Sequence, residues 1–476
     1  MNPLDLYRPS LGLLTDLYQL TMAAGYWALG LHDRQAVFHL YARKAPFGGS
    51  WAVAGGLEPA LGMLEGWGFD TDDVDYLAEL TGNDGEPLFA SGFLRYLSDL
   101  RFSCDVDAVP EGSLVAPPAP LLRVRGPLLQ AQILETPLLT VLNFQTLIAT
   151  KAARVVLAAG DDHVLEFGLR RAQGIDGGLS ASRAAYLGGA TATSNVLAGR
   201  LFGIPVKGTH AHSWIMVFED EPEAFASYAS AMPNNCVFLV DTYSTVEGVH
   251  RAVAAGKALR AQGHEMVGIR LDSGDLCALS KEARRILDAG GFPDAAVVAS
   301  NDLDEHRIVA LKAAGAPIGV WGVGTRLVTA HDQPSLGGVY KLGAIQDEAG
   351  TWQPRVKLSE NIAKVSIPGC LQVRRRVDPD TGLFLGDTIW DEHSHPLAPA
   401  TGEDHDLLVP CFRSGRRVLD AVPLAVSRAR ARAGVARMPE SARSLSGGTP
   451  YPVVLEPQLD ALRARMVTAA RSGGAR

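Results

Sequence analysis

The sequence predicts an α/β protein whose centre is a parallel sheet or barrel. Between residues 163 and 325, short apolar runs rich in β-branched residues recur, and a helix-like segment follows each one. The ends of successive runs lie about 20 to 40 residues apart, which is the usual length of a βα unit. The runs are HVLEFG (163–168), GIPVKGTH (203–210), CVFLVDTYST (236–245), MVGIRLDSGDL (266–276), AAVVASNDLDE (295–305) and PIGVWGVGT (317–325).

The segment before this region begins with a predicted helix. The stretch TDLYQLTMAAGYWALG (15–30) opens with Thr15 and Asp16, both good helix-capping residues. Its apolar residues recur at helical spacing, namely Leu17, Leu20, Ala24 and Trp27. This pattern predicts an amphipathic helix with one buried face.

The rest of the flanking sequence predicts a mixed α+β arrangement. AVFHLYAR (36–43) and LLRVRGPL (121–128) are typical of strands, and two helical stretches flank YPVV (451–454) near the end. We therefore expect an α+β domain over 1–145, the α/β region over 146–335 and a further segment of strands and helices over 336–476.

Composition argues against a nucleic-acid-binding protein. The chain has 476 residues, 47% of them hydrophobic and 20% charged, and its formal net charge is −8. This balance leaves no global positive field to attract a phosphate backbone. Four arginines gather near the end, but no aromatic residues alternate with them, so we interpret them as a solvated helix face. They are Arg428, Arg430, Arg432 and Arg437.

The sequence predicts a soluble cytoplasmic protein. Residues 1–10 lack the basic and apolar regions of a secretory signal. No apolar stretch reaches the roughly 18 to 20 uncharged residues that a membrane span needs. The five cysteines are widely spaced without a CxxC pair, which predicts reduced thiols rather than disulfides or a zinc ribbon. They are Cys104, Cys236, Cys277, Cys370 and Cys411.

Each predicted strand ends in a polar or glycine-rich cluster. In parallel α/β proteins the loops after the strands assemble the active site, so we expect these clusters to meet. GVGT (322–325) has backbone N–H groups and the Thr325 hydroxyl for a phosphate, although a plain tight turn explains the same four residues. Its place near the last strand favours the phosphate.

Two further clusters carry charge. RLDSGD (270–275) offers Arg270 for an anion, and carboxylates such as Asp272 for ribose hydroxyls or Mg²⁺. The structural alternative is a helix cap by Asp272 or Ser273. FGLRR (167–171) offers Phe167 for stacking and an arginine for a bidentate grip on a planar acid, with a surface salt bridge as the alternative for one arginine.

KGTHAHS (207–213) contains two histidines, His210 and His212, two residues apart. In an extended segment they suit a metal, although no third ligand is evident. One of them suits a nucleophile that accepts a phosphoryl group. A structural histidine is the third possibility, and the spacing alone does not choose among the three.

Several longer segments, taken in order, resemble those of nicotinate phosphoribosyltransferases. They are LLTDLYQLTMAAGYW, LEFGLRRAQGIDGG, SNVLAGRLFGIPVKGTHAHS, GIRLDSGDL, GVGTRLVT and SLGGVYKLGAI. The resemblance runs from about Leu13 to the YPVVLEPQLDALR segment and so covers nearly the whole chain. It implies an irregular α/β barrel and a second α+β domain formed by the N- and C-terminal segments.

The resemblance also implies a homodimer with shared active sites. Tyr18 matches a tyrosine that stacks on nicotinate, commonly from the neighbouring subunit. Phe167 and Arg170 match residues for the ring and the carboxylate, and Thr209 and Arg270 match further nicotinate-site positions. Ser213 completes the expected nicotinate set.

By the same resemblance, His212 matches a histidine that ATP phosphorylates, and Arg270 and Asp272 are the other expected catalytic residues. The expected contacts of phosphoribosyl pyrophosphate are Asp272, Ser273, Gly274, Gly322, Gly324 and Thr325. His210 and Arg326 depart from the family pattern, which has a variable, often apolar residue and a smaller residue at these positions.

The reaction that we expect is ATP-coupled formation of nicotinate mononucleotide in NAD salvage, with Mg²⁺ assisting the departure of diphosphate. Positioning and electrostatic stabilisation dominate such a reaction, and the pyridine nitrogen needs no general base. The competing hypotheses are a nicotinamide or quinolinate phosphoribosyltransferase and a non-catalytic sensor of NAD precursors. A barrel lyase is disfavoured because no lysine stands in a Schiff-base position.

Overall fold

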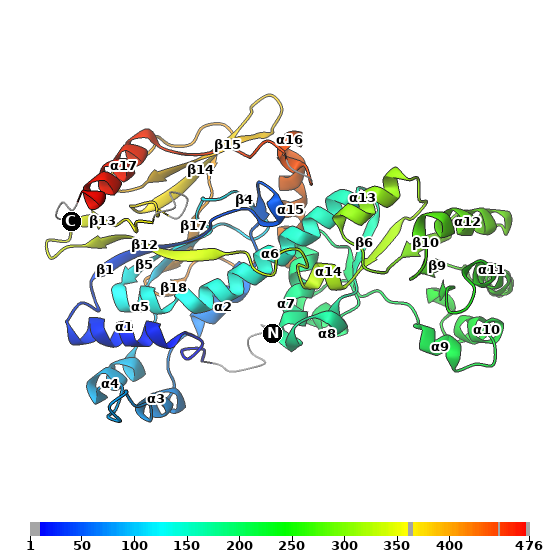
Figure 1. Cartoon of the computed structure of the whole chain (residues 1–476), viewed down its shortest axis with the longest axis horizontal. Coiled ribbons are helices and arrows are strands. Elements are labelled where there is room, and N and C mark those ends of the chain that lie inside the picture. Colours follow the sequence, from blue (N-terminus) through cyan, green and yellow to red (C-terminus); the bar gives the residue numbers. More distant parts are fainter. Residues whose placement is uncertain (1–9, 360–364, 446–447, 473–476) are drawn as a thin grey trace. The chain divides into compact units, whose positions relative to one another are not determined.

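The structure is a computed structural model that describes residues 10–359, 365–445 and 448–472. The first nine residues, where we expect no secretory signal, lie outside this range. The chain divides into two compact units (Figure 1). Unit 1 contains residues 1–150 and 335–476, and unit 2 contains residues 151–334. Two distant parts of the sequence thus build unit 1, and one continuous stretch builds unit 2.

Unit 1 contains a seven-stranded antiparallel sheet that joins the two parts of the sequence. Its inner strand β1 (Gln35–Ala42) pairs with β5 (Leu122–Pro127) on one side and with β12 (Gly338–Gln346) on the other. Seven of the eight β1 residues are buried, as expected for a central strand with both faces covered. The other strands are β3 (Asp105–Ala108), β13 (Trp352–Pro354), β17 (Val409–Arg413) and β18 (Arg416–Arg417).

A second sheet of unit 1 is built from the end of the chain. Its strands stand in the order β16 (His405–Asp406), β14 (Leu371–Val377), β15 (Phe384–Asp391) and β19 (Val453–Leu455). The predicted helices on both sides of YPVV are α15 (Leu424–Arg437) and α17 (Pro457–Arg471), and YPVV itself leads into β19. Two short strands and four short helices complete the unit: β2 (Ala52–Val53), β4 (Leu114–Val115), α2 (Leu57–Glu65), α3 (Thr71–Ala78), α4 (Ser91–Asp99) and α16 (Glu440–Arg443).

The predicted amphipathic helix is α1 (Leu17–Ala28), and Asp16 stands at its N-cap. Its buried face differs from the prediction, because Leu17 is 52% exposed whereas Gln19 is completely buried. The Gln19 amide donates to Glu135 Oε2 at 2.9 Å and accepts from Gln132 at 2.8 Å. A polar residue thus occupies the buried face because these hydrogen bonds satisfy it.

One helical stretch among the described residues is long and apolar enough to cross a membrane. It covers Leu128–Ala159 and includes α5 (Leu128–Ile133) and α6 (Glu135–Ala159). In its most apolar window, 67% is buried inside the protein. A helix of the core passes the same test of length and composition.

Unit 2 is built on a six-stranded parallel sheet, which agrees with the predicted α/β class. The order is β7 (Ala192–Thr193), β6 (His163–Glu166), β11 (Val320–Val323), β10 (Ala296–Ala299), β9 (Gly268–Leu271) and β8 (Val237–Leu239). Backbone ladders join these strands from β7 to β8 but not β8 back to β7, so the closed barrel is not confirmed.

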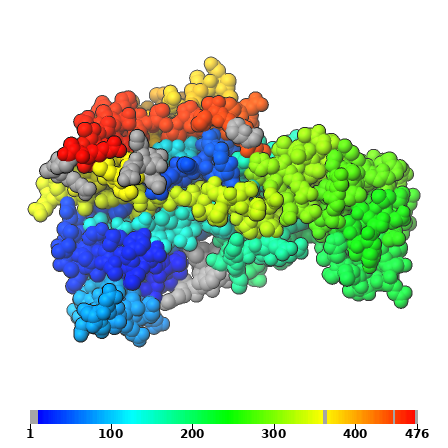
Figure 2. All heavy atoms as spheres, viewed as in Figure 1, coloured from blue at the N-terminus to red at the C-terminus, as the bar shows by residue number. Residues whose placement is uncertain are grey.

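Helices follow the strands of unit 2 as the βα pattern predicts. They are α7 (Gly174–Leu187), α8 (Val196–Phe202), α9 (His212–Met216), α10 (Glu221–Ala231), α11 (Thr245–Ala261), α12 (Leu276–Ala289), α13 (Glu305–Ala313) and α14 (Thr325–Val328). Figure 2 shows the atoms of α10, α11 and α12, in green, packed against one another on the face in view.

The prediction of a strand over 203–210 was wrong. Only Val206 forms a bridge, to Thr193 of β7. Four residues later, the His210 ring accepts a hydrogen bond from the Leu239 N–H of β8. The segment contains Pro205, which has no N–H to donate, and it therefore contacts the two outer strands of the sheet at single points.

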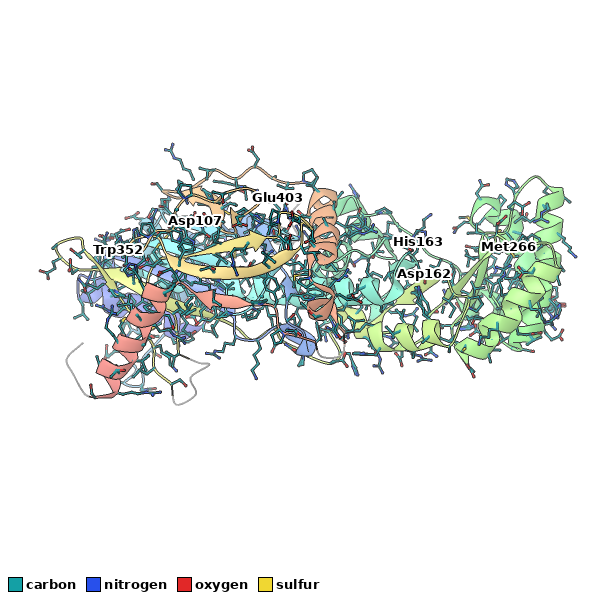
Figure 3. All side chains as sticks on the ribbon, turned by 90° about the horizontal axis from the view of Figure 1, so that it is seen from above. Asp107, Asp162, His163, Met266, Trp352 and Glu403 are labelled. Carbon is teal, nitrogen blue, oxygen red and sulfur yellow. The ribbon has the colours of Figure 1, made fainter. Side chains whose placement is uncertain are left out.

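Charged groups are buried within unit 2 beside α6. Lys151 Nζ lies 2.7 Å from Glu305 Oε2, and Arg154 Nε lies 2.9 Å from Glu305 Oε1. Glu305 and Lys151 are completely buried. Near the start of β6, Asp162, labelled in Figure 3 beside His163, accepts from Lys312 at 2.6 Å and from the Trp321 indole at 3.1 Å. The Glu305 pairs tie α6 to the start of α13, and the Asp162 bonds hold the start of β6.

Candidate active site

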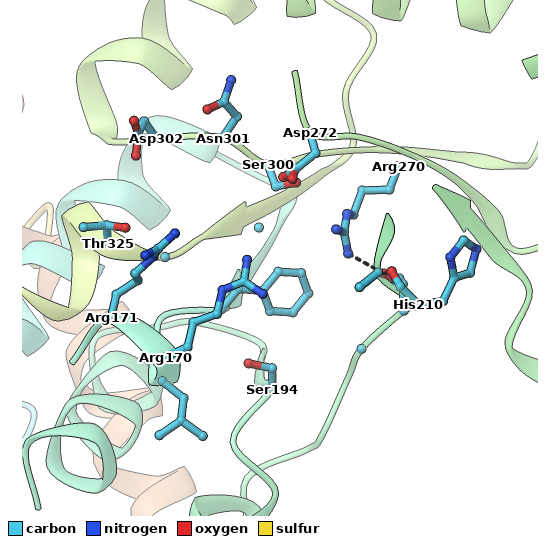
Figure 4. Close-up of a pocket in the computed structure, with 17 residues that line it drawn as sticks. Arg170, Arg171, Ser194, His210, Arg270, Asp272, Ser300, Asn301, Asp302 and Thr325 are labelled. Carbon is cyan, nitrogen blue, oxygen red and sulfur yellow. Dashed lines mark hydrogen bonds between the residues drawn. The ribbon is translucent and has the colours of Figure 1, made fainter. Parts of the chain in front are cut away.

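A cavity of about 430 Å³ lies in unit 2 where the strands end. It is lined by the loops that follow β6, β7, β9, β10 and β11 and by residues 208–211 (Figure 4). This is the position at which parallel α/β proteins hold their ligands. Eight of the predicted site residues line it: Phe167, Arg170, Thr209, Arg270, Asp272, Gly322, Gly324 and Thr325.

Arg270 is the most buried cation of the cavity. It is part of β9, and its Nη1 donates to the Thr209 hydroxyl at 2.5 Å. Its Nε is buried and has no hydrogen-bond partner among the described residues. Burial lowers the pKa of Arg270, Asp272 and Asp241 oppose this shift, and Arg170 adds to it. A bound anion would offset the cost of burying the Arg270 charge and would accept a hydrogen bond from Nε.

Arg170 approaches the same space from the other side of the cavity. Figure 4 shows the guanidinium groups of Arg170 and Arg270 directed toward each other. Arg170 belongs to a short turn of 3₁₀-helix, Leu169–Arg171, directly after β6. Two guanidinium groups that face one cavity are suited to a carboxylate or phosphate between them.

A buried carboxylate holds the loop that carries Phe167 and Arg170. Glu166 is completely buried and accepts hydrogen bonds from the Gly168 N–H, from Ser182 Oγ at 2.9 Å and from Thr193 Oγ1 at 2.6 Å. The Phe167 ring lies against Gly322, where an added Cβ would come within 2.8 Å of the ring. Because Gly322 has no side chain, the Phe167 ring can occupy this space.

Asp272 is held by a neighbour on each side. Its Oδ1 accepts from the Ser300 hydroxyl, and its backbone N–H donates to Asp241 Oδ2 at 2.8 Å. The same Asp241 oxygen accepts from Ser273 Oγ at 2.6 Å. The structural alternative of a helix cap by Asp272 or Ser273 is contradicted, because Asp275 caps α12 through its bonds to the N–H groups of Cys277 and Ala278. Asp272 and Ser273 are thus not used as caps.

His212 begins α9 and lies outside the lining of the cavity. Its Nδ1 lies 3.1 Å from Thr242 Oγ1, and its Nε2 lies 3.7 Å from Asp272 Oδ2. The side chain is 40% exposed, so a second reactant can reach it. Ser213, the next residue, is exposed.

His210 is a structural histidine. It is 7% exposed, and its Nε2 accepts the Leu239 N–H at 3.3 Å. Burial lowers its pKa to about 4, so the ring is neutral near pH 7. Among the described residues, no group of three or more His, Cys, Asp or Glu side chains could hold a metal ion. The metal hypothesis for the two histidines therefore has no further ligand to support it.

The GVGT cluster forms the end of β11 and the start of α14. Gly324 is the residue before this helix, and Thr325 is its first residue. Arg326, which departs from the family pattern, pairs with Asp304 Oδ2 at 2.6 Å. Because Asp304 also caps α13, Arg326 is fixed beside the loop and does not line the cavity.

Some lining residues were not predicted from the sequence. Asn301 and Asp302, after β10, have positive φ angles of 92° and 46°. Such backbone is costly for residues other than glycine and is concentrated at functional sites. Both belong to the SNDLDE cluster, so their position after a strand was the available signal. The other unpredicted lining residues include Arg171, Ser194 and Ser300.

Besides His212 and Ser213, three predicted residues lie away from the lining for different reasons. Tyr18 belongs to unit 1, on the first turn of α1, and is 49% exposed. Ser273 is held by Asp241, as described above. Gly274 follows it with a φ of 77°, which turns the chain toward Asp275 and the start of α12.

Comparison with known proteins gives a consistent result. Residues 13–143 match the sequence model of the nicotinate phosphoribosyltransferase N-terminal domain. The chain is 48% identical to nicotinate phosphoribosyltransferase of Bacillus subtilis over 381 residues, which cover 80% of this chain and 76% of the relative. It is 41% identical to nicotinate phosphoribosyltransferase pncB2 of Mycobacterium tuberculosis over 456 residues, which cover 95% and 93%.

A solved structure extends the likeness to the fold. The crystal structure of human nicotinic acid phosphoribosyltransferase superimposes with a TM-score of 0.82 and 35% sequence identity, over 95% of this chain and 99% of the human one. With such identity over nearly the full length of both chains, and with eight of the expected site residues around one cavity, the chain belongs to the nicotinate phosphoribosyltransferase family.

Proposed function

We propose that the cavity of unit 2 joins nicotinate to phosphoribosyl pyrophosphate and forms nicotinate mononucleotide and diphosphate, as a step of NAD salvage. The observation that carries this proposal is the buried Arg270 guanidinium with its unpartnered Nε, opposite Arg170. A carboxylate between the two would satisfy both groups. Nicotinate has one carboxylate, whereas the amide of nicotinamide has no charge to offer and quinolinate brings a second carboxylate to be neutralised.

The nicotinate ring is assigned to the side of the cavity that holds Phe167. The phenyl ring supplies a flat apolar surface for stacking, and Gly322 preserves its position. Thr209 Oγ1 accepts from Arg270 and donates to the His210 carbonyl at 3.2 Å, and Thr209 is assigned to this nicotinate site as the residue that positions the Arg270 guanidinium for the same carboxylate. Ser213 is assigned to the edge of this nicotinate site.

Phosphoribosyl pyrophosphate is assigned to the loops after β9 and β11. Asp272 and Ser273 are held by Ser300 and Asp241 and are suited to ribose hydroxyls and to the metal. Mg²⁺ is commonly held by one or two carboxylates together with substrate phosphate oxygens, and Asp272 and Asp302 in the lining fit this mode. When bound, Mg²⁺ would neutralise the charge of the departing diphosphate. Gly274, Gly322, Gly324 and Thr325 are the assigned phosphate contacts.

The chemistry assigned to this chain is positioning and charge stabilisation. The carboxylate grip of Arg170 and Arg270 would fix the pyridine nitrogen relative to the ribose carbon that it attacks. That carbon gains positive character as diphosphate departs, and the carboxylate of Asp272 stabilises positive charge nearby. The ring nitrogen is unprotonated near neutral pH, so no residue needs to remove a proton.

We also propose that ATP phosphorylates His212. Thr242 orients the ring through Nδ1, which leaves Nε2 on the side of Asp272. A phosphoryl group on this ring would add negative charge beside Asp272, which is assigned to phosphoribosyl pyrophosphate. The added charge would change how that site binds its substrate, and in this way ATP hydrolysis would be coupled to the reaction. ADP would leave in the transfer, and hydrolysis of the phosphohistidine by water would release phosphate and return the enzyme to its starting state.

The proposed assembly is a cytoplasmic homodimer with shared active sites. Tyr18 is 49% exposed on α1, so its ring is available to a neighbouring subunit. A mixing experiment tests this assignment. Tyr18→Ala and Arg270→Ala variants, each inactive alone, should regain activity when they are unfolded and refolded together, because a mixed dimer has one intact site. If the mixture stays inactive although mixed dimers form, the shared site is wrong.

The first test of the reaction compares nicotinate, nicotinamide and quinolinate with phosphoribosyl pyrophosphate and Mg²⁺, with and without ATP. Product formed from nicotinate alone supports the assigned substrate, and turnover of another pyridine assigns a sister activity. Absence of turnover with all three would leave the sensor hypothesis. Stimulation by ATP should be lost in His212→Ala and kept in His306→Ala, which changes an exposed histidine of the same unit.

A further inference from the structure

The arginines of α15 do not form one solvated face. Arg430 and Arg437 line a second cavity of about 300 Å³ in unit 1, whereas Arg432 is exposed. The prediction of a solvated helix face is therefore wrong for two of the four arginines. The cavity lies between α15 and residues of the strands β4, β14, β15, β16 and β17, and the loop residues Pro110, Ser113 and Leu407 complete its lining. A cavity of this size accepts a small organic molecule.

Most charges of this cavity are already paired. Arg375 forms two hydrogen bonds with Asp387, at 2.9 and 2.7 Å, and both residues are buried. Asp406 is held by Arg374. Arg437 donates to the Gly382 carbonyl at 2.7 Å and to the carboxylate of Glu403, labelled in Figure 3, at 2.5 Å. These groups need no further counter-ion.

Arg430 differs from them. Its Nη1 donates to the Glu111 backbone carbonyl at 2.6 Å, and no carboxylate of the described residues lies within ion-pair distance of it. The Glu111 side chain accepts from the Gly56 N–H. Burial lowers the pKa of Arg430, and the more distant Glu111 charge opposes this shift only in part. Arg430 is thus a half-buried cation with free N–H groups and no paired anion.

The remaining lining is apolar or small except for His405, an exposed residue whose Nδ1 lies 2.9 Å from the Glu403 carbonyl oxygen. Leu114, Phe384 and Val409 supply apolar surface, and Ala433 and Gly434 line the cavity along α15. An added Cβ on Gly434 would come within 3.1 Å of Leu114. The cavity therefore combines one unpaired cation with an apolar body of limited size, which suits a ligand with one negative charge and a small apolar part.

We propose that this cavity binds a small organic monoanion, whose carboxylate pairs with Arg430 while its apolar part lies against Leu114 and Phe384. The site does not depend on the proposed function, because all of its residues belong to unit 1. It would place a ligand site apart from the residues assigned to nicotinate and phosphoribosyl pyrophosphate in unit 2.

Titration calorimetry with benzoate tests the proposal. The titration uses the full-length Arg270→Ala protein, so that the proposed nicotinate site has lost its buried guanidinium. Arg430→Gln added to this background should weaken benzoate binding by roughly tenfold to a hundredfold, as expected for the loss of one charged hydrogen bond. The control Arg432→Gln, which changes an exposed arginine of the same helix, should bind benzoate with unchanged affinity.

Two further measurements keep the result unambiguous. Benzamide, which has the same shape without the charge, should not bind. Ala433→Phe, which fills the cavity and retains every charge, should abolish benzoate binding even if Arg430→Gln fails to fold. The proposal is overturned if the Arg270→Ala protein binds no benzoate, if benzamide binds as well as benzoate, or if Ala433→Phe leaves the affinity unchanged.

Discussion

The carboxylate of Asp241, two residues after β8, accepts the backbone N–H of Asp272, directly after β9, at 2.8 Å. The same oxygen accepts from Ser273 Oγ. Asp241 therefore determines where both residues lie, although it does not line the cavity itself. Its effect on the reaction should be indirect and selective.

Asp241→Ala should raise the KM for phosphoribosyl pyrophosphate by about tenfold, because two hydrogen bonds that position Asp272 and Ser273 are lost. The KM for nicotinate should change much less. Asp241→Asn keeps one acceptor oxygen and should restore part of the loss. Steady-state kinetics with each substrate varied in turn check this expectation, and equal changes in both KM values would contradict a positioning role.

Gly322→Ala should weaken nicotinate binding by displacing the Phe167 ring. The added Cβ would lie 2.8 Å from Phe167 Cδ2, which forces the ring to move. We expect a severalfold rise in the KM for nicotinate and a destabilisation of about 1 to 3 kcal/mol, as overpacking usually costs. Gly319→Ala is the matched control, since its added Cβ meets nothing within 4 Å. The same KM change in both variants would remove Phe167 from the nicotinate site.

Glu305→Gln should lower the free energy of unfolding by about 3 to 5 kcal/mol, because it removes a carboxylate that two buried cations share. Urea denaturation measures this change. Glu265→Gln breaks the exposed pair with Arg260 and should change the free energy of unfolding far less, because solvent screens an exposed pair. Similar losses of unfolding free energy in the two variants would mean that burial adds nothing to the contribution of the Glu305 ion pairs.

Acid should destabilise unit 2 through His210. Its pKa is about 4 in the folded protein, below the ordinary value of 6.5, because burial disfavours the charged ring. Between these two pH values the unfolded chain binds a proton here and the folded chain does not, so stability is lost as the pH falls. His210→Gln keeps an acceptor for the Leu239 N–H. Between about pH 4 and pH 6.5 it should reduce the slope of the unfolding free energy against pH by about 1.4 kcal/mol per pH unit.

The strands of unit 2 could be predicted where the apolar run was long enough to be recognised. Five of the six predicted runs contain a strand, namely β6, β8, β9, β10 and β11. The run 203–210 was misassigned because it contacts the two outer strands at single points, through Val206 and His210, without joining a ladder. Strand β7 has only two residues, Ala192 and Thr193, and no periodicity can identify so short a strand.

The cluster positions predicted much of the cavity, because parallel strands bring their ends to one edge. The pairings inside it were beyond prediction. Thr209 bonds with Arg270 from 61 residues away. Three neighbouring residues, Asp272, Ser273 and Asp275, were equally good caps for α12, and only the path of the chain through Gly274 selects Asp275. Tertiary geometry decides such choices among residues of equal local propensity.

The pairing of β1 with β12 also has a consequence for the order in which the protein can fold during synthesis. Residues 36–42 are made early, and their partners at 338–345 follow only after all of unit 2 has been made. Until then one edge of an almost wholly apolar strand stays open, and closing so long a loop is entropically costly. Synthesis of unit 2 therefore sets the interval during which that edge is open to pairing with other chains.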